Sequence, residues 1–153
     1  MPRRSVRHSV QTAAALSPRR WAALAEAAAW IGWTRAAMSL RPWRRVADRF
    51  EREPVRPGPP DWARANLVLW AVSAVARRVL PEKPCLTQAL VARTLLRRAG
   101  VDTELRIGAA RDAEAGFRAH AWLEHDGDIV MGRTRADEYV PFAPARAGTP
   151  ARP

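Results

Sequence analysis

The sequence contains a single cysteine, a single lysine and only three histidines among its 153 residues. One cysteine excludes an internal disulfide framework and a zinc site built from several thiolates. His8, His120 and His125 lack the four-residue spacing of a helical metal pair, and no P-loop for nucleotide phosphates is present. We therefore expect neither a metal nor another cofactor. A lone thiol is typical of a reducing, cytoplasmic setting.

A long uncharged apolar run is also missing. The most apolar window, 21–40, is interrupted by Glu26 and Arg35, whereas a membrane-spanning helix needs about 20 mostly uncharged apolar residues. The basic start of the chain is followed by only a short apolar stretch, which is not typical of a secretory signal. The sequence predicts neither a membrane span nor an export signal.

Arginine, by contrast, is in excess. Lys and Arg number 26 against 15 Asp and Glu, a net charge of +11. Residues 1–56 hold 12 basic against 4 acidic residues (+8), and residues 57–153 hold 14 against 11 (+3). Such a basic N-terminal part indicates an anionic partner. Alternatively, it reflects only a general bias toward arginine in the proteins of the source organism. Because no nucleic-acid-binding motif accompanies the charge, solvated helix faces or docking to an acidic protein are the favoured interpretations.

The chain divides by composition into four parts. Residues 1–16 are predicted to form a flexible basic tail, and residues 17–60 N-terminal helices followed by a proline-rich linker. Residues 61–142 would form the core, and residues 143–153 a second flexible tail. Apolar residues make up 48% of the chain, which is enough to build a hydrophobic core.

Apolar residues at helical spacing predict four helices in the first two thirds of the chain. They are expected over 19–40, 43–51, 62–80 and 86–99. Ser17 with Pro18, and Asp61, are suitable starts for the first and third helices, and Gly100 is a natural stop for the fourth. In the first helix, one face would hold Trp21, Leu24, Ala28, Ile31 and Arg35.

The tryptophans of these helices have two interpretations. They could grip a peptide or stack on bases, as in proteins that bind single strands. Their helical spacing favours core packing for most of them instead. The set consists of Trp21, Trp30, Trp33, Trp62 and Trp70.

After Gly100 the apolar period changes from helical to alternating, which predicts strands. They are expected over 103–109, 118–124 and 128–131, and a last one over 139–142. Asp126-Gly127 is a strong two-residue hairpin turn, which would pair residue 125 with 128 and residue 121 with 132. Helices followed by a small antiparallel sheet define an α+β fold.

Cys85 and His120 are the residues that could do chemistry. The N–H groups and the dipole at the start of a helix favour a thiolate at Cys85 and could hold an oxyanion. His120 shares a strand face with Trp122 and Glu124, and a sheet lying against the Cys85 helix could bring the imidazole within reach as general base. The structural alternatives are a buried cysteine and a histidine bound to a carbonyl. His125, beside the turn, is expected to be exposed and without a role.

Several segments occur in an order that is found in a known family: Pro84-Cys85-Leu86, Ala89-Leu90, Leu95-Leu96-Arg97-Arg98-Ala99-Gly100-Val101, Leu105-Arg106-Ile107-Gly108, Phe117-Arg118-Ala119-His120-Ala121-Trp122-Leu123-Glu124 and Asp126-Gly127. A cysteine at a helix start, then a strand, then His-Ala-Trp on the next strand resembles the papain-like core of transglutaminases. Residues 79–132 are more closely similar to the leader peptidase of lasso-peptide biosynthesis. The similarity is to the stand-alone form, whose leader-recognition module is a separate polypeptide.

The resemblance implies both a fold and an activity. N-terminal helices would precede a transglutaminase- or papain-like catalytic core, residues 61–142, in which the cysteine helix packs on a small antiparallel sheet. The enzyme would be a cysteine peptidase that removes the leader from a ribosomally synthesised precursor, with Cys85 as nucleophile and His120 as base. Its partners would be the precursor's leader peptide, a separate leader-recognition protein and a lasso cyclase. No cofactor is implied.

The sequence departs from this family at the third catalytic position. The family has an aspartate on the strand after the histidine, whereas the predicted hairpin puts Gly132 and Arg133 beside His120. Asp137 or Glu138 could fold back, the site could work as a Cys-His dyad, or a backbone carbonyl could orient the imidazole. The missing acid also leaves a second function open: a non-catalytic adaptor or nucleic-acid-binding protein that uses the arginine-rich surface.

Overall fold

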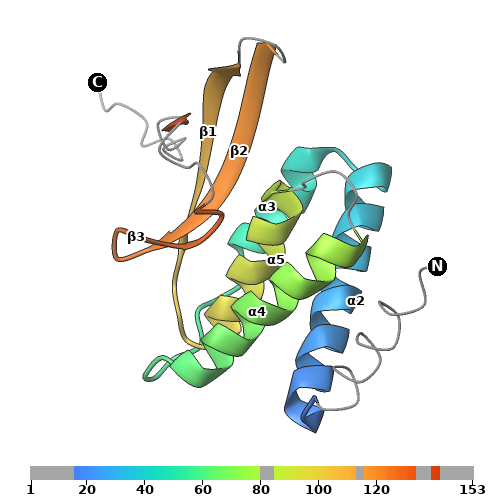
Figure 1. The fold of residues 1–153 in the computed structure, drawn as a ribbon, viewed down its shortest axis with the longest axis vertical. Helices are drawn as coiled ribbons and strands as arrows, with labels where there is room; N and C mark the ends of the chain where they lie inside the picture. The colour runs from blue at the N-terminus through green and yellow to red at the C-terminus, as the bar shows by residue number, and fades with distance from the viewer. Residues whose placement is uncertain (1–15, 80–84, 113–115, 134–138, 142–153) are drawn as a thin grey trace, which may run out of the picture.

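The computed structural model describes residues 16–79, 85–112, 116–133 and 139–141 (Figure 1). In these residues helices come first and strands follow, so the α+β class predicted from the sequence is confirmed. The helices are α2 (Pro18–Leu40), α3 (Trp43–Glu51), α4 (Trp62–Val79) and α5 (Cys85–Arg98). The strands are β1 (Glu104–Asp112), β2 (Gly116–His125), β3 (Asp128–Met131) and β4 (Val140–Pro141).

Local signals in the sequence place the helix ends. Pro18 opens α2, where its fixed φ suits the first turn, although the Ser17 side chain makes no capping hydrogen bond. Asp61 caps α4, because its Oδ1 accepts a hydrogen bond from the backbone N–H of Arg64 at 2.9 Å. Gly100 follows α5 with a φ of 79°, the left-handed conformation that ends a helix.

The buried face of helix α2 overlaps the predicted face only in part, at Ile31 and at Leu24, which packs on the core. Ala27, Ile31 and Thr34 are buried, whereas Ala28 and Arg35 are exposed. Alanine residues are spread around much of the circumference of this helix, so its apolar pattern does not identify which face will be buried. Although α2 covers the most apolar window, no helix in the described part of the chain is long and apolar enough to cross a membrane.

The strands form one antiparallel sheet in the order β3-β2-β1-β4. Strands β1 and β2 pair from Glu104↔Glu124 to Asp112↔Gly116, while β3 and β4 pair only over short stretches. The hairpin turn between β2 and β3 is the one predicted, with φ of 49° at Asp126 and 88° at Gly127. These two left-handed residues are typical of a type I′ turn.

A β-bulge interrupts the regular register between β2 and β3. Glu124 pairs with Ile129 as predicted, but Leu123 pairs with Met131 rather than with Val130. The extra residue turns Met131 to the face of Leu123, and both side chains are buried in the main core. The predicted pairing of residue 121 with 132 is therefore wrong by one residue.

One face of the sheet packs against the helices, which lie together on one side of β1 and β2 (Figure 1). Ala121 and Leu123 of β2 belong to the main core together with buried residues of α2, α4 and α5. Ile107 and Leu105, their partners on β1, contact the same core. Since strand side chains alternate between faces, His120 lies on the opposite face.

The proline-rich segment between α3 and α4 lies against the C-terminal end of α5. The backbone N–H of Arg56 donates to the carbonyl of Arg97, and that of Asp61 to the carbonyl of Ala99, both at 2.8 Å. The Arg97 guanidinium in turn donates to the carbonyl of Glu53 at 3.0 Å. We call this segment the proline strap, because its hydrogen bonds hold it across α5.

Candidate functional site

Cys85 is the first residue of α5, as the sequence predicts, and its free thiol is half-buried. Its side chain packs at the edge of the main core. The first N–H groups of a helix have no acceptor within the helix, so this end of α5 carries a partial positive charge. Helix α5 is itself held firmly, since Leu90, Val91 and Leu95 are fully buried.

His120 lies in β2 opposite Gly108 of β1. Its Nε2 is 2.8 Å from the carbonyl oxygen of Gly132. A carbonyl only accepts hydrogen bonds, so this contact assigns the proton of the neutral imidazole to Nε2 and leaves the lone pair on Nδ1. Of the orienting groups that the sequence left open, a backbone carbonyl is therefore present. Asp137 and Glu138 lie outside the described residues.

Two aromatic rings flank the imidazole of His120. The Trp122 ring is stacked on it, with centroids 6.1 Å apart, and the Tyr139 ring lies at 5.1 Å. Trp122 is only 2% exposed, and its Nε1–H donates to the carboxylate of Glu124 at 2.7 Å. Arg106 donates to the other oxygen of that carboxylate at 3.0 Å. Trp122 is thus a fixed support for His120. The sequence did not predict that Tyr139 would contact the imidazole.

Two glycines make room for the Trp122 ring. A Cβ built on Gly108 would lie 2.9 Å from the far edge of the indole, and one on Gly132 would lie 2.8 Å from the Trp122 Cβ. Gly132 also has a φ of 84°, which favours glycine. The left-handed turn at Gly132 lets the backbone approach Trp122 closely and brings its carbonyl to His120.

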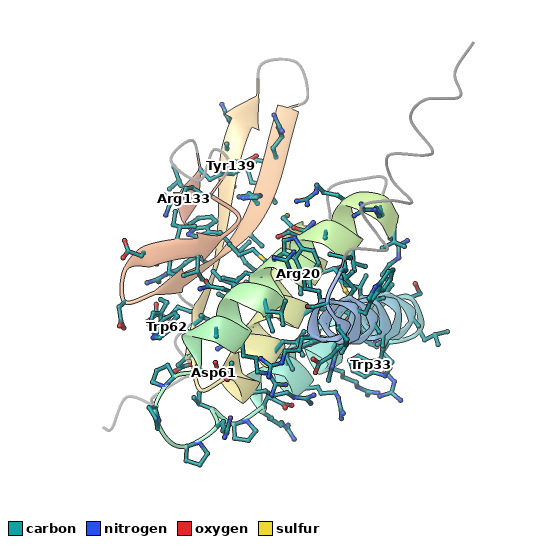
Figure 2. The ribbon with its side chains drawn as sticks, turned by 60° about the horizontal axis from the view of Figure 1, so that its bottom comes forward. Arg20, Trp33, Asp61, Trp62, Arg133 and Tyr139 are labelled. Atoms are coloured by element: carbon teal, nitrogen blue, oxygen red, sulfur yellow. The ribbon has the colours of Figure 1, made fainter. Side chains whose placement is uncertain are left out.

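The structure does not bring Cys85 and His120 together. His120 is on the sheet face opposite to the one that packs on α5, because Ala121 and Leu123 occupy the latter. Tyr139, whose ring is tilted against that of His120, lies on the side of the sheet away from α2 and α4 (Figure 2). Among the described residues no hydrogen bond joins the thiol to the imidazole. The half-buried thiol therefore packs on the core that covers the helix-facing side of the sheet, and the oriented imidazole points from the other face.

The prediction that His125 is exposed is wrong. The side chain is half-buried, and its Nδ1–H donates to the carbonyl of Asp102 at 2.6 Å. Its ring packs edge-on against Trp62 with centroids 5.1 Å apart. His125 therefore attaches the end of β2 to the start of α4. In the described ranges no three His, Cys, Asp or Glu side chains gather to hold a metal ion.

The prediction that most of the helix tryptophans are core residues is also wrong. Several of the rings keep about half of their surface in solvent: Trp21 (50%), Trp33 (40%) and Trp62 (47%). Helical spacing did not separate these rings from the better-buried ones, because an indole is large enough to reach the core while keeping an edge in water.

With the fold and these positions in place, the family of the chain can be stated. The transglutaminase-like superfamily matches residues 28–146, so the chain belongs to this superfamily, which includes cysteine peptidases and acyltransferases. Both Cys85 and His120 fall within the matched residues. No curated protein and no solved structure matches the chain.

Proposed function

We propose that this protein is a cysteine peptidase that removes the leader from a ribosomally made lasso precursor peptide. The observation that carries the proposal is the position of the only thiol: Cys85 is the first residue of a helix inside a transglutaminase-like chain. The oriented imidazole of His120 gives further support. The lasso precursor as substrate class rests on the resemblance of residues 79–132 to stand-alone leader peptidases.

In the proposed reaction the Cys85 sulfur attacks the scissile carbonyl while its proton passes to Nδ1 of His120. The first N–H groups of α5 would hold the oxyanion that forms. When this intermediate collapses, the C–N bond breaks and the core peptide leaves as an amine that takes the proton from His120. The leader then remains bound as a thioester. Water, deprotonated by the same imidazole, hydrolyses the thioester and releases the leader carboxylate and the free thiol.

The Gly132 carbonyl would take the orienting part of an aspartate in this mechanism. It accepts the Nε2–H of His120 and so keeps Nδ1 available for proton transfer. A neutral carbonyl stabilises the imidazolium less than a carboxylate does, so we expect a slower enzyme than one with a full triad.

The reaction requires Cys85 and His120 to meet, which gives the leader-recognition partner a second task. A ligand can shift a conformational equilibrium by as much as it prefers one state, so binding of the partner and precursor would have to favour the assembled pair. Toward the tip of the β1–β2 hairpin, residues 116–119 of β2 pair only with β1 among the described residues and are exposed or half-buried, whereas Ala121 and Trp122 are buried. Movement costs least near the tip, so the partner would have to displace His120 from a better-held segment next to it.

The first test is cleavage of the precursor by the full chain together with its leader-recognition partner, followed by mass spectrometry. Replacing Cys85 by Ala should abolish cleavage, and His120→Ala should slow it by about 10²- to 10⁴-fold. His125→Ala is the matched control on the same strand and should cleave at close to the wild-type rate. Cleavage that survives both Cys85→Ala and His120→Ala would refute the peptidase.

The second test measures whether the pair assembles. Because Cys85 is the only thiol, its alkylation can be followed by intact mass at a series of pH values. In the chain alone His120→Ala should leave the profile unchanged, because the imidazole points from the sheet face opposite to the core on which the thiol packs. With partner and precursor bound, His120→Ala should slow alkylation near neutral pH. An unchanged profile in both states would exclude His120 as the base.

The separation of Cys85 and His120 favours one alternative, a non-catalytic adaptor on the same fold. An adaptor would bind its partner equally well with Cys85→Ala, and no combination of partner and precursor would yield a cleaved product. If its partner were nucleic acid, affinity would fall steeply with salt.

A further inference from the structure

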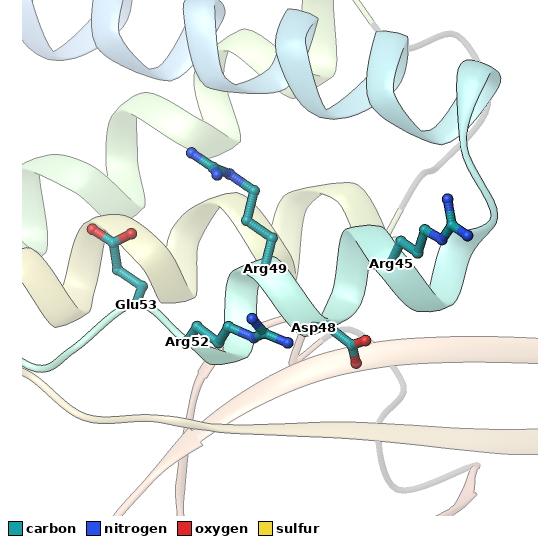
Figure 3. Close-up of a pocket in the computed structure, with 5 residues that line it drawn as sticks. All are labelled: Arg45, Asp48, Arg49, Arg52 and Glu53. Carbon is teal, nitrogen blue, oxygen red and sulfur yellow. The ribbon is translucent and has the colours of Figure 1, made fainter.

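A groove of about 430 Å³ lies on the surface of α3 (Figure 3). All of its lining residues carry charged side chains: Arg45, Asp48, Arg49, Arg52 and Glu53. We call it the α3 groove. Neither candidate catalytic residue lines it, so a ligand bound there would not contact the thiol or the imidazole.

Positive charge dominates the α3 groove. Glu53 is already neutralised by Arg98, whose Nε lies 2.7 Å from its carboxylate. Asp48 is then the one acid that faces three arginines, which leaves a net charge of about two positive units at neutral pH. In the described residues none of the three groove arginines forms an ion pair with an acidic side chain. Their guanidinium groups are available to an outside carboxylate.

An exposed aromatic ring borders the groove. The Arg49 guanidinium lies over the Trp33 ring at 5.1 Å and extends from α3 toward α2 (Figure 3). Trp33 is 40% exposed, yet its ring packs on Phe50 at 5.9 Å and on Trp30 at 5.7 Å. A rigid, partly exposed tryptophan beside arginine is typical of the residues that dominate protein–protein binding energy.

The spacing of the arginines suits an extended acidic peptide. Arg45, Arg49 and Arg52 are four and three residues apart on one helix face, about 6 Å and about 4.5 Å along the axis. Alternate side chains of an extended peptide are about 6.6 Å apart. The spacing of Arg45 and Arg49 is close to this repeat, so carboxylates at two alternate positions could each meet one of these guanidinium groups through two parallel hydrogen bonds, whereas the spacing of Arg49 and Arg52 is shorter than the repeat.

The acid in the groove distinguishes between classes of anion. A phosphodiester backbone carries a charge on every nucleotide and would be repelled by Asp48. A polypeptide of mixed sequence can place a basic or amide side chain there and a hydrophobic one against Trp33. We propose that the α3 groove binds an acidic polypeptide segment with carboxylates at alternate positions and an apolar side chain beside Trp33. Binding of an acidic segment is argued from the groove alone. The further statement that this segment belongs to the leader-recognition partner rests on the proposed function.

The test is a titration of the full chain, followed by fluorescence anisotropy at low and high salt. The probes are a labelled short peptide that alternates Glu with Ser and carries one Phe, its Lys-for-Glu counterpart, and a single-stranded thymidine oligonucleotide. The groove variant combines Arg45→Gln, Arg49→Gln and Arg52→Gln. Circular dichroism and thermal unfolding establish that each variant is folded.

A control variant makes the same charge change elsewhere, with Arg19→Gln, Arg77→Gln and Arg111→Gln at three exposed positions. The groove variant should bind the acidic peptide at least about tenfold more weakly, because three positive charges are lost, and the control should lose less than about threefold. If the groove variant does not fold, the Arg→Lys triple variant replaces it. Lysine keeps the charge but not the paired hydrogen bonds, so affinity should still fall.

Three results would overturn the proposal: no binding of the acidic peptide by the wild type, an equal loss in the groove and control variants, or tighter binding of the oligonucleotide that the groove variant loses. Trp33→Ala gives a further check, since it should weaken the Phe-containing peptide more than an Ala version. Cys85→Ala should bind the peptide as the wild type does. Failure of the peptidase would therefore leave the binding result intact.

Discussion

Replacement of Gly132 by Ala should lower the free energy of unfolding by more than the loss of a left-handed glycine alone would. Two separate causes act at this position. The φ of 84° forces alanine into the left-handed region, and the new Cβ would lie 2.8 Å from the Trp122 Cβ and 3.0 Å from the carbonyl oxygen of Ala121. The first atom is the Cβ of a side chain that is only 2% exposed, and the second belongs to the backbone. Neither atom can move away by a change of side-chain rotamer.

The magnitude follows from these two causes. A left-handed L-residue costs about 1–2 kcal/mol, and overpacking a tight site costs about 1–3 kcal/mol, so Gly132→Ala should lose about 2–5 kcal/mol. Gly127→Ala is the matched control. Its φ is 88°, but a Cβ there meets nothing within 4 Å, so it should lose only the first contribution, about 1–2 kcal/mol.

Urea unfolding followed by circular dichroism measures both free energies, and thermal unfolding gives a second reading. A chain of this size loses about 2–4 °C of Tm per kcal/mol, so Gly132→Ala should melt about 2–12 °C below Gly127→Ala. Equal destabilisation by the two substitutions would refute the close packing of Gly132 on Trp122. The support of His120 that depends on this packing would then be refuted as well.

Three further predictions concern single contacts. Asp61→Ala should lose about 1 kcal/mol in urea unfolding because the cap of α4 is removed, whereas Asp61→Asn should keep most of it; equal losses would argue against the cap. Arg97→Ala should lose about 2–3 kcal/mol, since its guanidinium donates to the Glu53 carbonyl and to Asp102, and exposed Arg77→Ala should be nearly neutral by the same measurement. Trp122→Phe should lose about 2–4 kcal/mol in thermal unfolding, because the hydrogen bond to Glu124 and part of the buried ring are removed together.

The features that the sequence predicted well depend on short-range signals. Pro18, Asp61 and Gly100 act within one turn of their own position, and α3 begins and ends where expected. The turn at Asp126-Gly127 requires two left-handed residues in succession, and few other pairs adopt that conformation readily. Helices and turns of this kind can be recognised without knowledge of the tertiary structure.

The side of the sheet on which His120 lies could not be predicted in this way. Alternation correctly groups His120 with Trp122 and Glu124, but it does not tell which face meets the helices. Both faces of β2 carry buried apolar side chains, Leu123 on one and Trp122 on the other. The choice between them depends on the packing of α5, which lies in a distant part of the sequence.

The partner of His120 was predicted only in part. The sequence put Gly132 beside His120 and left a backbone carbonyl open as the orienting group, but every residue carries a carbonyl, so the residue pattern could not select it over Asp137 or Glu138. The placement of this carbonyl results from the bulge between Leu123 and Glu124 and from the left-handed turn at Gly132. A regular hairpin register, which the sequence favoured, could not predict this backbone path.

The proline strap has a consequence for how the chain unfolds. Its N–H groups donate to the carbonyls of Arg97, which also accepts from Gly100, and of Ala99 just beyond α5, so residues that precede α4 help to complete this end of the helix. Loss of the strap would fray α5 from the end that leads into β1. We therefore expect the N-terminal helices and the sheet to melt in one cooperative transition, and a fragment that begins at Asp61 to melt at a lower temperature and over a broader range.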